Sequence, residues 1–281
     1  MSAGFLTNPE KGWTVITGAS AGLGHAFARR CAARGDNLFL ADLPGTGLPA
    51  LAGTLSSTGI EVRAIECDLS REEGRSAFLA SILESRAPIS LLVNNVGIGD
   101  NGLFDRLPYE AAKAVIDLNI GATVALTHGL VPALGKTPGS HIITVASLAA
   151  FYPMPLFAIY SSTKAFLLSW SLALRQELSD LGIGVTVLAP GGMYTNEETR
   201  EKVRSQGLSG RLSTMEPAQV AAFALAAADR NKAIAIPGLF NKLLWFAGSH
   251  APKNLVAASI RSRWEHALSR LPGSEGVCFR P

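Results

Sequence analysis

The chain has 281 residues, of which 48% are hydrophobic and 17% charged, so it can bury a large core and is not expected to be disordered. Its net charge of +3 and the absence of a basic run argue against a nucleic-acid-binding protein. Three scattered cysteines fit neither a metal-binding spacing nor a disulfide framework, which predicts no metal site and a cytoplasmic setting. No stretch of about 20 residues lacks both charges and helix breakers, so we expect no membrane span.

The first predicted elements are a strand over 13–17, a glycine-rich turn and a helix over 25–34. The turn reads Thr17-Gly-Ala-Ser-Ala-Gly-Leu-Gly24. Gly18 and Gly22 would let the backbone approach a pyrophosphate, Gly24 would allow close helix packing, and the helix N-terminus would attract the anion. This order predicts a dinucleotide site. A glycine-rich loop without a ligand is the alternative.

An acidic residue closes the second predicted strand, Asn37–Ala41. Asp42 lies roughly 20 residues beyond the glycine turn, where a carboxylate can accept hydrogen bonds from both adenosine ribose hydroxyls. It would also repel a 2′-phosphate, and no Lys or Arg follows it closely. Asp42 therefore favours NAD over NADP, unless it is only a surface residue in a turn.

Two further strands are predicted over 60–65 and 89–93, with a helix over 48–57 between the second and third strands. Asp68 follows the third strand, where it could contact an adenine amine or cap the helix expected near Arg71. Asn94-Asn-Val-Gly97 follows the fourth strand. Ligands bind at this carboxyl edge in parallel α/β sheets.

A long helix is predicted over 108–133, and Asn119 lies within it. Because Asn is a poor residue for a helix interior, we expect it to have a polar partner, in a functional site or simply in the core. A fifth strand over 140–146 ends at Ser147, and an aromatic, proline-rich loop over 151–157 follows.

Tyr160-Ser-Ser-Thr-Lys164 begins the next predicted helix. Residues four apart lie on the same helix face, so the phenol and the ammonium would be neighbours. A tyrosine has an ordinary pKa of about 10, and a nearby cation favours its ionised form. Such a phenol can exchange a proton with a carbonyl or an alcohol. Alone, the pair could equally be a solvated helix face.

The remaining predicted elements are a strand over 183–189, a helix over 216–229 and a strand over 232–236. Pro190-Gly-Gly-Met-Tyr-Thr195 leaves the strand over 183–189 at its carboxyl end. The polar segment 196–214 is a candidate lid over the site.

In this order and spacing, the motifs resemble those of the short-chain dehydrogenase/reductase family from about residue 12 to 238. Ser147 precedes Tyr160 by 13 residues, the gap usual in the family. Val96 is a departure, because the family usually has Ala there. The resemblance implies an α/β, three-layer, doubly wound Rossmann fold, with a mostly parallel seven-stranded sheet and helices on both faces.

The family resemblance also implies the site residues. Tyr160 would be the general acid/base, Lys164 would lower the tyrosine pKa and hold the nicotinamide ribose, Ser147 would bind the substrate oxygen, and Asn119 would hold a water in a proton relay. The residues implied to contact the cofactor are Gly18, Ser20, Gly22, Leu23, Gly24, Asp42, Asp68, Leu69, Asn95, Val96, Gly97, Tyr160, Lys164, Pro190, Gly191, Met193 and Thr195.

The apolar loop 150–157, which Leu103, Phe104, Met193 and Tyr194 could join, predicts a hydrophobic secondary alcohol or ketone as substrate. Packing of the core or of a subunit interface is the alternative reading of these residues. NADP-dependent carbonyl reduction and a non-catalytic, dinucleotide-sensing protein are the alternative functions. Because the family pairs subunits through the helices carrying Asn119 and Tyr160, we expect a homodimer or homotetramer.

The sequence divides into an expected NAD-binding domain over 1–238, an amphipathic helical extension over 239–271 packed on it, and a flexible tail over 272–281. Apolar residues recur in the extension at helical spacing, with a break near Pro252. The extension could cover the substrate cleft, enlarge a subunit interface or lie on a membrane surface, in that order of preference.

Overall fold

A computed structural model describes residues 12–99, 102–194 and 212–268, with residues 264–268 described by their backbone only. Its centre is a seven-stranded parallel sheet in the order β3-β2-β1-β4-β5-β6-β7. The strands are β1 (Trp13–Thr17), β2 (Asn37–Asp42), β3 (Val62–Glu66), β4 (Ile89–Asn94), β5 (His141–Val145), β6 (Gly184–Leu188) and β7 (Ile234–Ala235).

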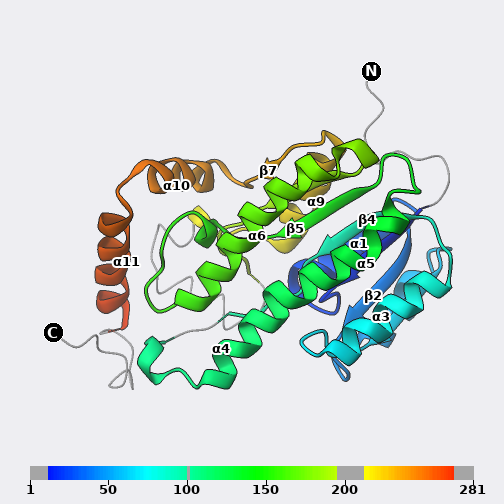
Figure 1. Cartoon of the computed structure of the whole chain (residues 1–281), viewed down its shortest axis with the longest axis horizontal. Coiled ribbons are helices and arrows are strands. Elements are labelled where there is room, and N and C mark those ends of the chain that lie inside the picture. Colours follow the sequence, from blue (N-terminus) through cyan, green and yellow to red (C-terminus); the bar gives the residue numbers. More distant parts are fainter. Residues whose placement is uncertain (1–11, 100–101, 195–211, 269–281) are drawn as a thin grey trace.

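Helices cover both faces of the sheet (Figure 1). Phe27, Leu48 and Val220 share one buried cluster, which places their helices on one face. These helices are α1 (Gly22–Ala33), α2 (Leu48–Ser56) and α9 (Pro217–Asp229). Phe78 and Leu126 belong to a second buried cluster on the opposite face, and the partly buried Leu174 packs against it. Their helices are α3 (Glu72–Glu84), α5 (Thr123–Leu134) and α6 (Ala158–Glu177).

The central strands are buried because both faces of the sheet are covered, whereas the edge strand β3 is partly exposed. All five residues of β1, β5 and β6 are buried, and most of these are Val, Ile, Leu or Thr. β-Branched residues suit such strands, because their side chains pack well on a pleated surface. The three-layer, doubly wound fold expected from the sequence is therefore confirmed.

Several boundaries differ from the sequence expectation. α1 begins at Gly22, so the end of the glycine-rich turn is already helical. β7 has only two residues, because pairing with β6 is confined to Ile234 and Ala235. The helix expected over 108–133 is α4 (Tyr109–Ile116), the π-turn η2 (Asp117–Ala122) and α5 in succession.

By length and composition alone, Tyr109–Leu134 is the one described helix that could cross a membrane, although no span was expected from the sequence. In the fold it packs with β4, α3 and α6. A core helix of a globular domain passes the same length and composition criteria, so this is weak support for a span.

Beyond the sheet, α10 (Leu239–His250) and α11 (Lys253–Leu268) lie at one edge of the molecule (Figure 1). The break between them at Ala251 and Pro252 agrees with the expected pair of helices. Three short 3-10 turns complete the described elements: η1 (Phe104–Arg106), η3 (Leu148–Ala150) and η4 (Ser179–Leu181).

Candidate active site

The predicted site residues gather at the carboxyl ends of the parallel strands. After β1 the chain enters α1, which packs on one face of the sheet, and after β4 it reaches η2 and α5, which pack on the other face. The strand order therefore reverses between the neighbours β1 and β4. In open α/β sheets, ligands bind in the crevice beyond such a switch point.

The turn after β1 requires glycine at several positions, because a Cβ atom would strain the backbone or clash there. Gly18 and Gly22 have φ of +65° and +53°, in the left-handed region that favours glycine. A Cβ on Gly24 would lie 1.9 Å from the Gly18 carbonyl oxygen. The backbone can therefore turn and pack as the sequence predicts, and only glycine fits at position 24.

The predicted cofactor residue Asn95 supports this turn directly. Its Nδ2 donates to the carbonyl oxygens of Thr17 at 2.9 Å and Gly18 at 3.1 Å. The backbone N–H groups of Asn95 and Val96 donate to Thr17 Oγ1, both at 3.0 Å. The Asn95 side chain therefore fixes the glycine turn, since both of its N–H donors are used by the protein.

The turn and α1 fit the pyrophosphate of a dinucleotide. No side chain caps the N-terminus of α1, and its first turn contains no acidic residue. The leading N–H groups of a helix carry a partial positive charge and need acceptors. Ser20 and Leu23, the other residues predicted in this turn, lie beside them, with Leu23 buried.

Asp42 stands at the end of β2, beside the turn. Its Oδ2 accepts the Ser20 N–H at 2.8 Å, and its Oδ1 accepts the Leu43 N–H at 2.9 Å. Each carboxylate oxygen has two acceptor positions, so one on each remains for a ribose hydroxyl. The Ser20 hydroxyl pairs with Thr46 Oγ1 at 2.8 Å.

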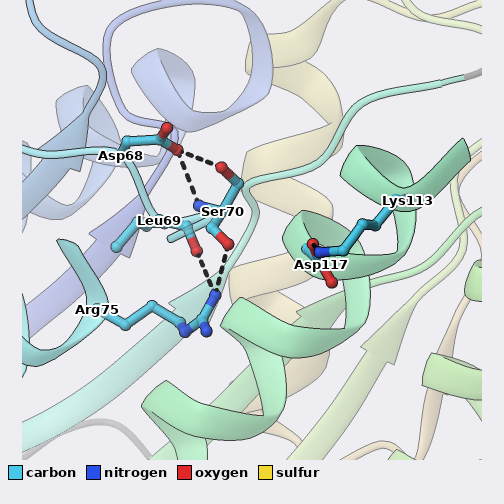
Figure 2. Close-up of polar contacts among 6 residues, drawn as sticks. All are labelled: Asp68, Leu69, Ser70, Arg75, Lys113 and Asp117. Carbon is cyan, nitrogen blue, oxygen red and sulfur yellow. Dashed lines mark hydrogen bonds and ion pairs between the residues drawn. The ribbon is translucent and has the colours of Figure 1, made fainter. Parts of the chain in front are cut away.

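Asp68 does not cap the helix that follows it. Its Oδ1 accepts the Ser70 hydroxyl at 2.7 Å and the Ser70 N–H at 2.9 Å, while α3 begins beyond Arg71 without a side-chain cap. The hydrogen bond from the Ser70 hydroxyl lowers the pKa of Asp68. Figure 2 shows Arg75 fixing the same loop by donating to the carbonyl oxygens of Leu69 and Ser70.

Lys164 is almost fully buried, and its Nζ donates to the Val145 carbonyl oxygen at 2.9 Å. The same Nζ lies 5.7 Å from the centre of the Tyr160 ring, so the two side chains are neighbours on α6. Burial lowers the pKa of Lys164 to about 8. The lysine therefore brings a positive charge, and a labile proton, next to the phenol at neutral pH.

Asn119 joins three parts of the site. Its Oδ1 accepts the Ile98 N–H and its Nδ2 donates to the Ile98 carbonyl oxygen, both at 2.9 Å, and Nδ2 also donates to Thr163 Oγ1 at 3.0 Å. A Cβ on Gly97 would lie 3.0 Å from Asn119 Oδ1 and 3.3 Å from Lys164 Nζ. The loop after β4 therefore passes tightly against both polar groups.

The relay water assigned to Asn119 stays a prediction. Because the protein uses both amide donors of Asn119, a water would have to bind the second lone pair of Oδ1 or the main chain. Asn119 lies in η2, where the π-turn interrupts regular helical bonding. Such turns often occur at functional sites.

Ser147 is the residue before η3, and η3 packs against α6. Its Oγ accepts the Ala149 N–H at 3.1 Å. Because this bond uses a lone pair, the hydroxyl proton remains available to a substrate oxygen. Lys164 donates to the carbonyl oxygen of Val145, which is two residues before Ser147. The end of β5 therefore holds the lysine ammonium close to the serine.

Comparison with known proteins identifies the family. Residues 12–206 match the sequence profile of the short chain dehydrogenase family. The chain belongs to this family. It is therefore an NAD(P)-dependent oxidoreductase with the fold and the Tyr-Lys helix described above.

Known members differ in substrate. This chain is 35% identical over 182 residues to the very-long-chain 3-oxoacyl-CoA reductase of Phaeosphaeria nodorum. The match covers 63% of this chain but only 53% of that relative. L-Sorbose reductase of Gluconobacter frateurii, solved with NADPH and L-sorbose, is 27% identical with a TM-score of 0.73, over 81% of this chain and 95% of that one.

A short-chain dehydrogenase of Sphingobium yanoikuyae, solved with NADPH, is 29% identical with a TM-score of 0.71. The alignment covers 95% of this chain and 98% of that structure.

The predicted nicotinamide side of the dehydrogenase is described only in part. The Pro190 carbonyl oxygen accepts the Leu148 N–H at 2.9 Å, which ties the loop after β6 to η3. A Cβ on Gly191 would lie 2.7 Å from Asn241 Oδ1. Met193 pairs with Met215 in an isolated bridge. Thr195 and most of the candidate lid over 196–214 lie outside the described residues.

The loop over 151–157 follows η3 on the predicted substrate side of the dehydrogenase. Phe151 packs edge-on against Trp245 of α10, with ring centres 6.1 Å apart. Leu156 is buried, whereas Phe104, which could join this loop, is 67% exposed in η1. The aromatic loop is therefore braced by the C-terminal extension.

Thr163 is a site residue that sequence reasoning missed. It accepts the Asn119 amide, and its own hydroxyl donates to the Tyr160 carbonyl oxygen at 2.8 Å. The sequence offered one indication of its role: Thr163 is three residues after Tyr160, so it lies one helical turn from the phenol-bearing residue. Its partner comes from a distant helix, which residue spacing does not reveal.

A cavity of about 380 Å³ lies apart from the reactive groups, between the start of α3 and α4. Lys113 and Asp117 form an ion pair on its wall (Figure 2). Its lining carries three basic and four acidic residues, which nearly cancel: Arg71, Arg75, Lys113, Glu72, Glu73, Glu110 and Asp117. The cavity therefore has no clear preference for a charged ligand.

Proposed function

We propose that the enzyme interconverts a secondary alcohol and a ketone, with Tyr160 as the proton donor and acceptor. The placement of the Lys164 Nζ 5.7 Å from the Tyr160 ring centre, beside the Gly97 backbone, carries this proposal. A nicotinamide cofactor, when bound, supplies or accepts the hydride. The chain itself orients the reactants and moves the proton.

In the reduction direction, the Tyr160 hydroxyl gives its proton to the carbonyl oxygen as that oxygen gains negative charge. The Ser147 hydroxyl donates a hydrogen bond to the same oxygen and stabilises the developing charge. The positive charge of Lys164 stabilises the phenolate that remains. Oxidation of the alcohol uses the same groups in reverse.

Replacing the phenol alone tests this assignment. We expect Tyr160→Phe to lose nearly all turnover, about 10²-fold or more because a general acid/base typically contributes 10²–10⁴-fold, yet to bind the dinucleotide as the wild type does. Turnover is followed by absorbance of the reduced cofactor, and binding by its fluorescence. Tyr109→Phe is the control, because it removes the same hydroxyl from a ring that lies outside the site and is 74% exposed in the single chain. Full activity of Tyr160→Phe would remove the mechanism.

For the cofactor, we propose NAD rather than NADP. The support is the Asp42 carboxylate at the end of β2, where a 2′-phosphate would meet a negative charge. The two solved relatives with NADPH are observations in favour of the alternative, an NADP-dependent carbonyl reductase. The carboxylate of this chain's own Asp42 decides our choice.

We expect Asp42→Ala to lower kcat/KM for NAD and to raise it for NADP, because the ribose acceptor and the repulsion disappear together. A change of about tenfold in each direction corresponds to about 1.4 kcal/mol. Asp36→Asn is the control, since Asp36 precedes β2 and binds Thr14 and Arg34 instead. A wild-type preference for NADP, unchanged by Asp42→Ala, would overturn the NAD proposal.

For the substrate, we propose a hydrophobic secondary alcohol or ketone, such as a steroid-like, fatty or aromatic compound. Support comes from the apolar loop over 150–157 and from the fatty-acyl chemistry in the name of the 35% identical relative. Assays over matched apolar and polar alcohols check this choice. A preference for polyols, the class to which L-sorbose points, would contradict it.

We also infer a homodimer or homotetramer that pairs through the helices carrying Asn119 and Tyr160. Large apolar side chains remain exposed on these helices of the single chain: Tyr109, Ile116 and Phe166. Burying them against a second copy would remove this apolar area from water. Light scattering measures the mass in solution.

A further inference from the structure

α10 has two opposite faces, and its inner face is part of the fold. Asn241 is 1% exposed and donates from Nδ2 to the Pro237 carbonyl oxygen at 2.8 Å. Trp245 packs on Phe151. Gly248 fits against the Tyr152 ring, since a Cβ there would lie 2.5 Å from Tyr152 Cδ1. These contacts fix which side of the helix faces away.

The outer face of α10 carries an apolar stripe, defined here as Leu239, Leu243 and Phe246. These side chains are 84%, 61% and 56% exposed. Positions i, i+4 and i+7 lie on one side of a helix, so they form a single row. On α11, Leu255 is also 66% exposed. Figure 1 shows both helices at the edge of the molecule, beyond the covered sheet.

The same segment holds the positive charge of the chain. Residues 239–263 contain four basic residues and no Asp or Glu: Lys242, Lys253, Arg261 and Arg263. The whole chain has 25 basic and 22 acidic residues, so the remainder has 21 basic against 22 acidic, a net charge of −1. The basic excess therefore lies on the same pair of helices as the apolar stripe, with Lys242 on α10 and the other three on α11. Lys242 Nζ also lies 5.9 Å from the Phe223 ring centre, and Lys253 Nζ donates to the Phe151 carbonyl oxygen.

We propose that the apolar stripe of α10 docks on the surface of a bilayer that contains anionic lipids. Leu and Phe side chains enter the boundary between headgroups and acyl chains, while the net positive charge of residues 239–263 attracts the anionic headgroups. A second copy of this chain fits the stripe less well, because two segments of charge +4 without acidic residues would repel each other. This proposal concerns binding alone and does not depend on the reaction.

Vesicle co-sedimentation tests the proposal with the full chain. We expect the protein to pellet with vesicles of phosphatidylcholine and phosphatidylglycerol, to remain mostly in solution with phosphatidylcholine alone, and to be released by high salt, which screens surface charges. The double variant Leu243→Glu, Phe246→Glu should lose at least tenfold in vesicle affinity.

Leu181→Glu is the matched control, because Leu181 is 54% exposed in η4, outside the apolar stripe. It should bind vesicles like the wild type, and both proteins should keep the wild-type melting temperature. Equal binding to neutral and anionic vesicles, no binding, or full binding by the double variant would overturn the proposal. A lower oligomer mass for the double variant would also overturn it, since a second copy would then cover the stripe.

Discussion

Two buried basic side chains, Lys164 and His141, have lowered pKa values but different surroundings. Lys164 lies next to Tyr160 at the sheet edge, with a pKa of about 8. His141 lies inside the sheet, where its Nε2 hydrogen-bonds with Thr186 Oγ1 at 2.8 Å. Burial, with a smaller contribution from Arg175, lowers the pKa of His141 to about 3. His141 is therefore neutral in the fold above about pH 3.

The neutral His141 predicts a loss of stability in mild acid. A histidine in the unfolded chain has a pKa near 6.5, whereas His141 in the folded chain has a pKa of about 3. Between these two pH values the unfolded chain binds a proton at this residue and the folded chain does not. The free energy of unfolding is therefore unaffected by His141 above pH 6.5 and falls by about 1.4 kcal/mol per pH unit below it. We expect His141→Gln to lose about 2 kcal/mol less than wild type between pH 7 and pH 5 in urea unfolding. Parallel losses in the two proteins would contradict the assignment.

Local spacing was enough to find some site residues, but not their contacts. The neighbourhood of Tyr160 and Lys164 follows from their i, i+4 separation on a helix. The role of Asn95 could not be predicted in the same way, because its acceptors lie on another strand end, more than 70 residues earlier. The alternatives for Asp68 also needed the fold, which pairs it with Ser70.

Among the elements, the glycine turn and α1 depend most on close packing. Gly24 is the third residue of α1, and its Cα faces the Gly18 carbonyl and the Asn95 amide. The sequence predicted this packing because strand, glycine turn and helix follow one another directly. It did not predict that the helix begins at Gly22, since glycine is a poor helix former and only the surrounding packing compensates.

We expect Gly24→Ala to destabilise the fold by about 1–3 kcal/mol, as overpacking does, and to raise the KM for the dinucleotide. The new Cβ would meet a backbone carbonyl oxygen at 1.9 Å, and a backbone cannot rotate away as a side chain can. Gly53→Ala in α2 is the control, because no atom lies within 4 Å of its new Cβ. It should stabilise by about 0.5–1 kcal/mol. Unfolding curves and KM values for both variants check the pair.

At the scale of the whole molecule, the extension after residue 238 continues the fold through α10. Asn241 packs against Gly191 in the predicted nicotinamide loop, and Trp245 packs against Phe151 in the predicted substrate loop. Periodicity could predict two helices here, but not which side faces inward, because both sides of α10 carry large apolar residues. The expected domain boundary at residue 238 stays a prediction.

Trp245 and Phe246 are adjacent in sequence but lie on opposite faces of α10, so substitutions there test the two faces separately. We expect Trp245→Ala to raise the KM for an apolar ketone by about tenfold while leaving the KM for the dinucleotide unchanged, because Phe151 loses its aromatic partner and the loop over 151–157 its support. Phe246→Ala, on the outer face, should leave both constants unchanged. If the two variants had the same steady-state kinetics, the inner face of α10 would not shape the substrate site, and the extension would act only through its outer surface.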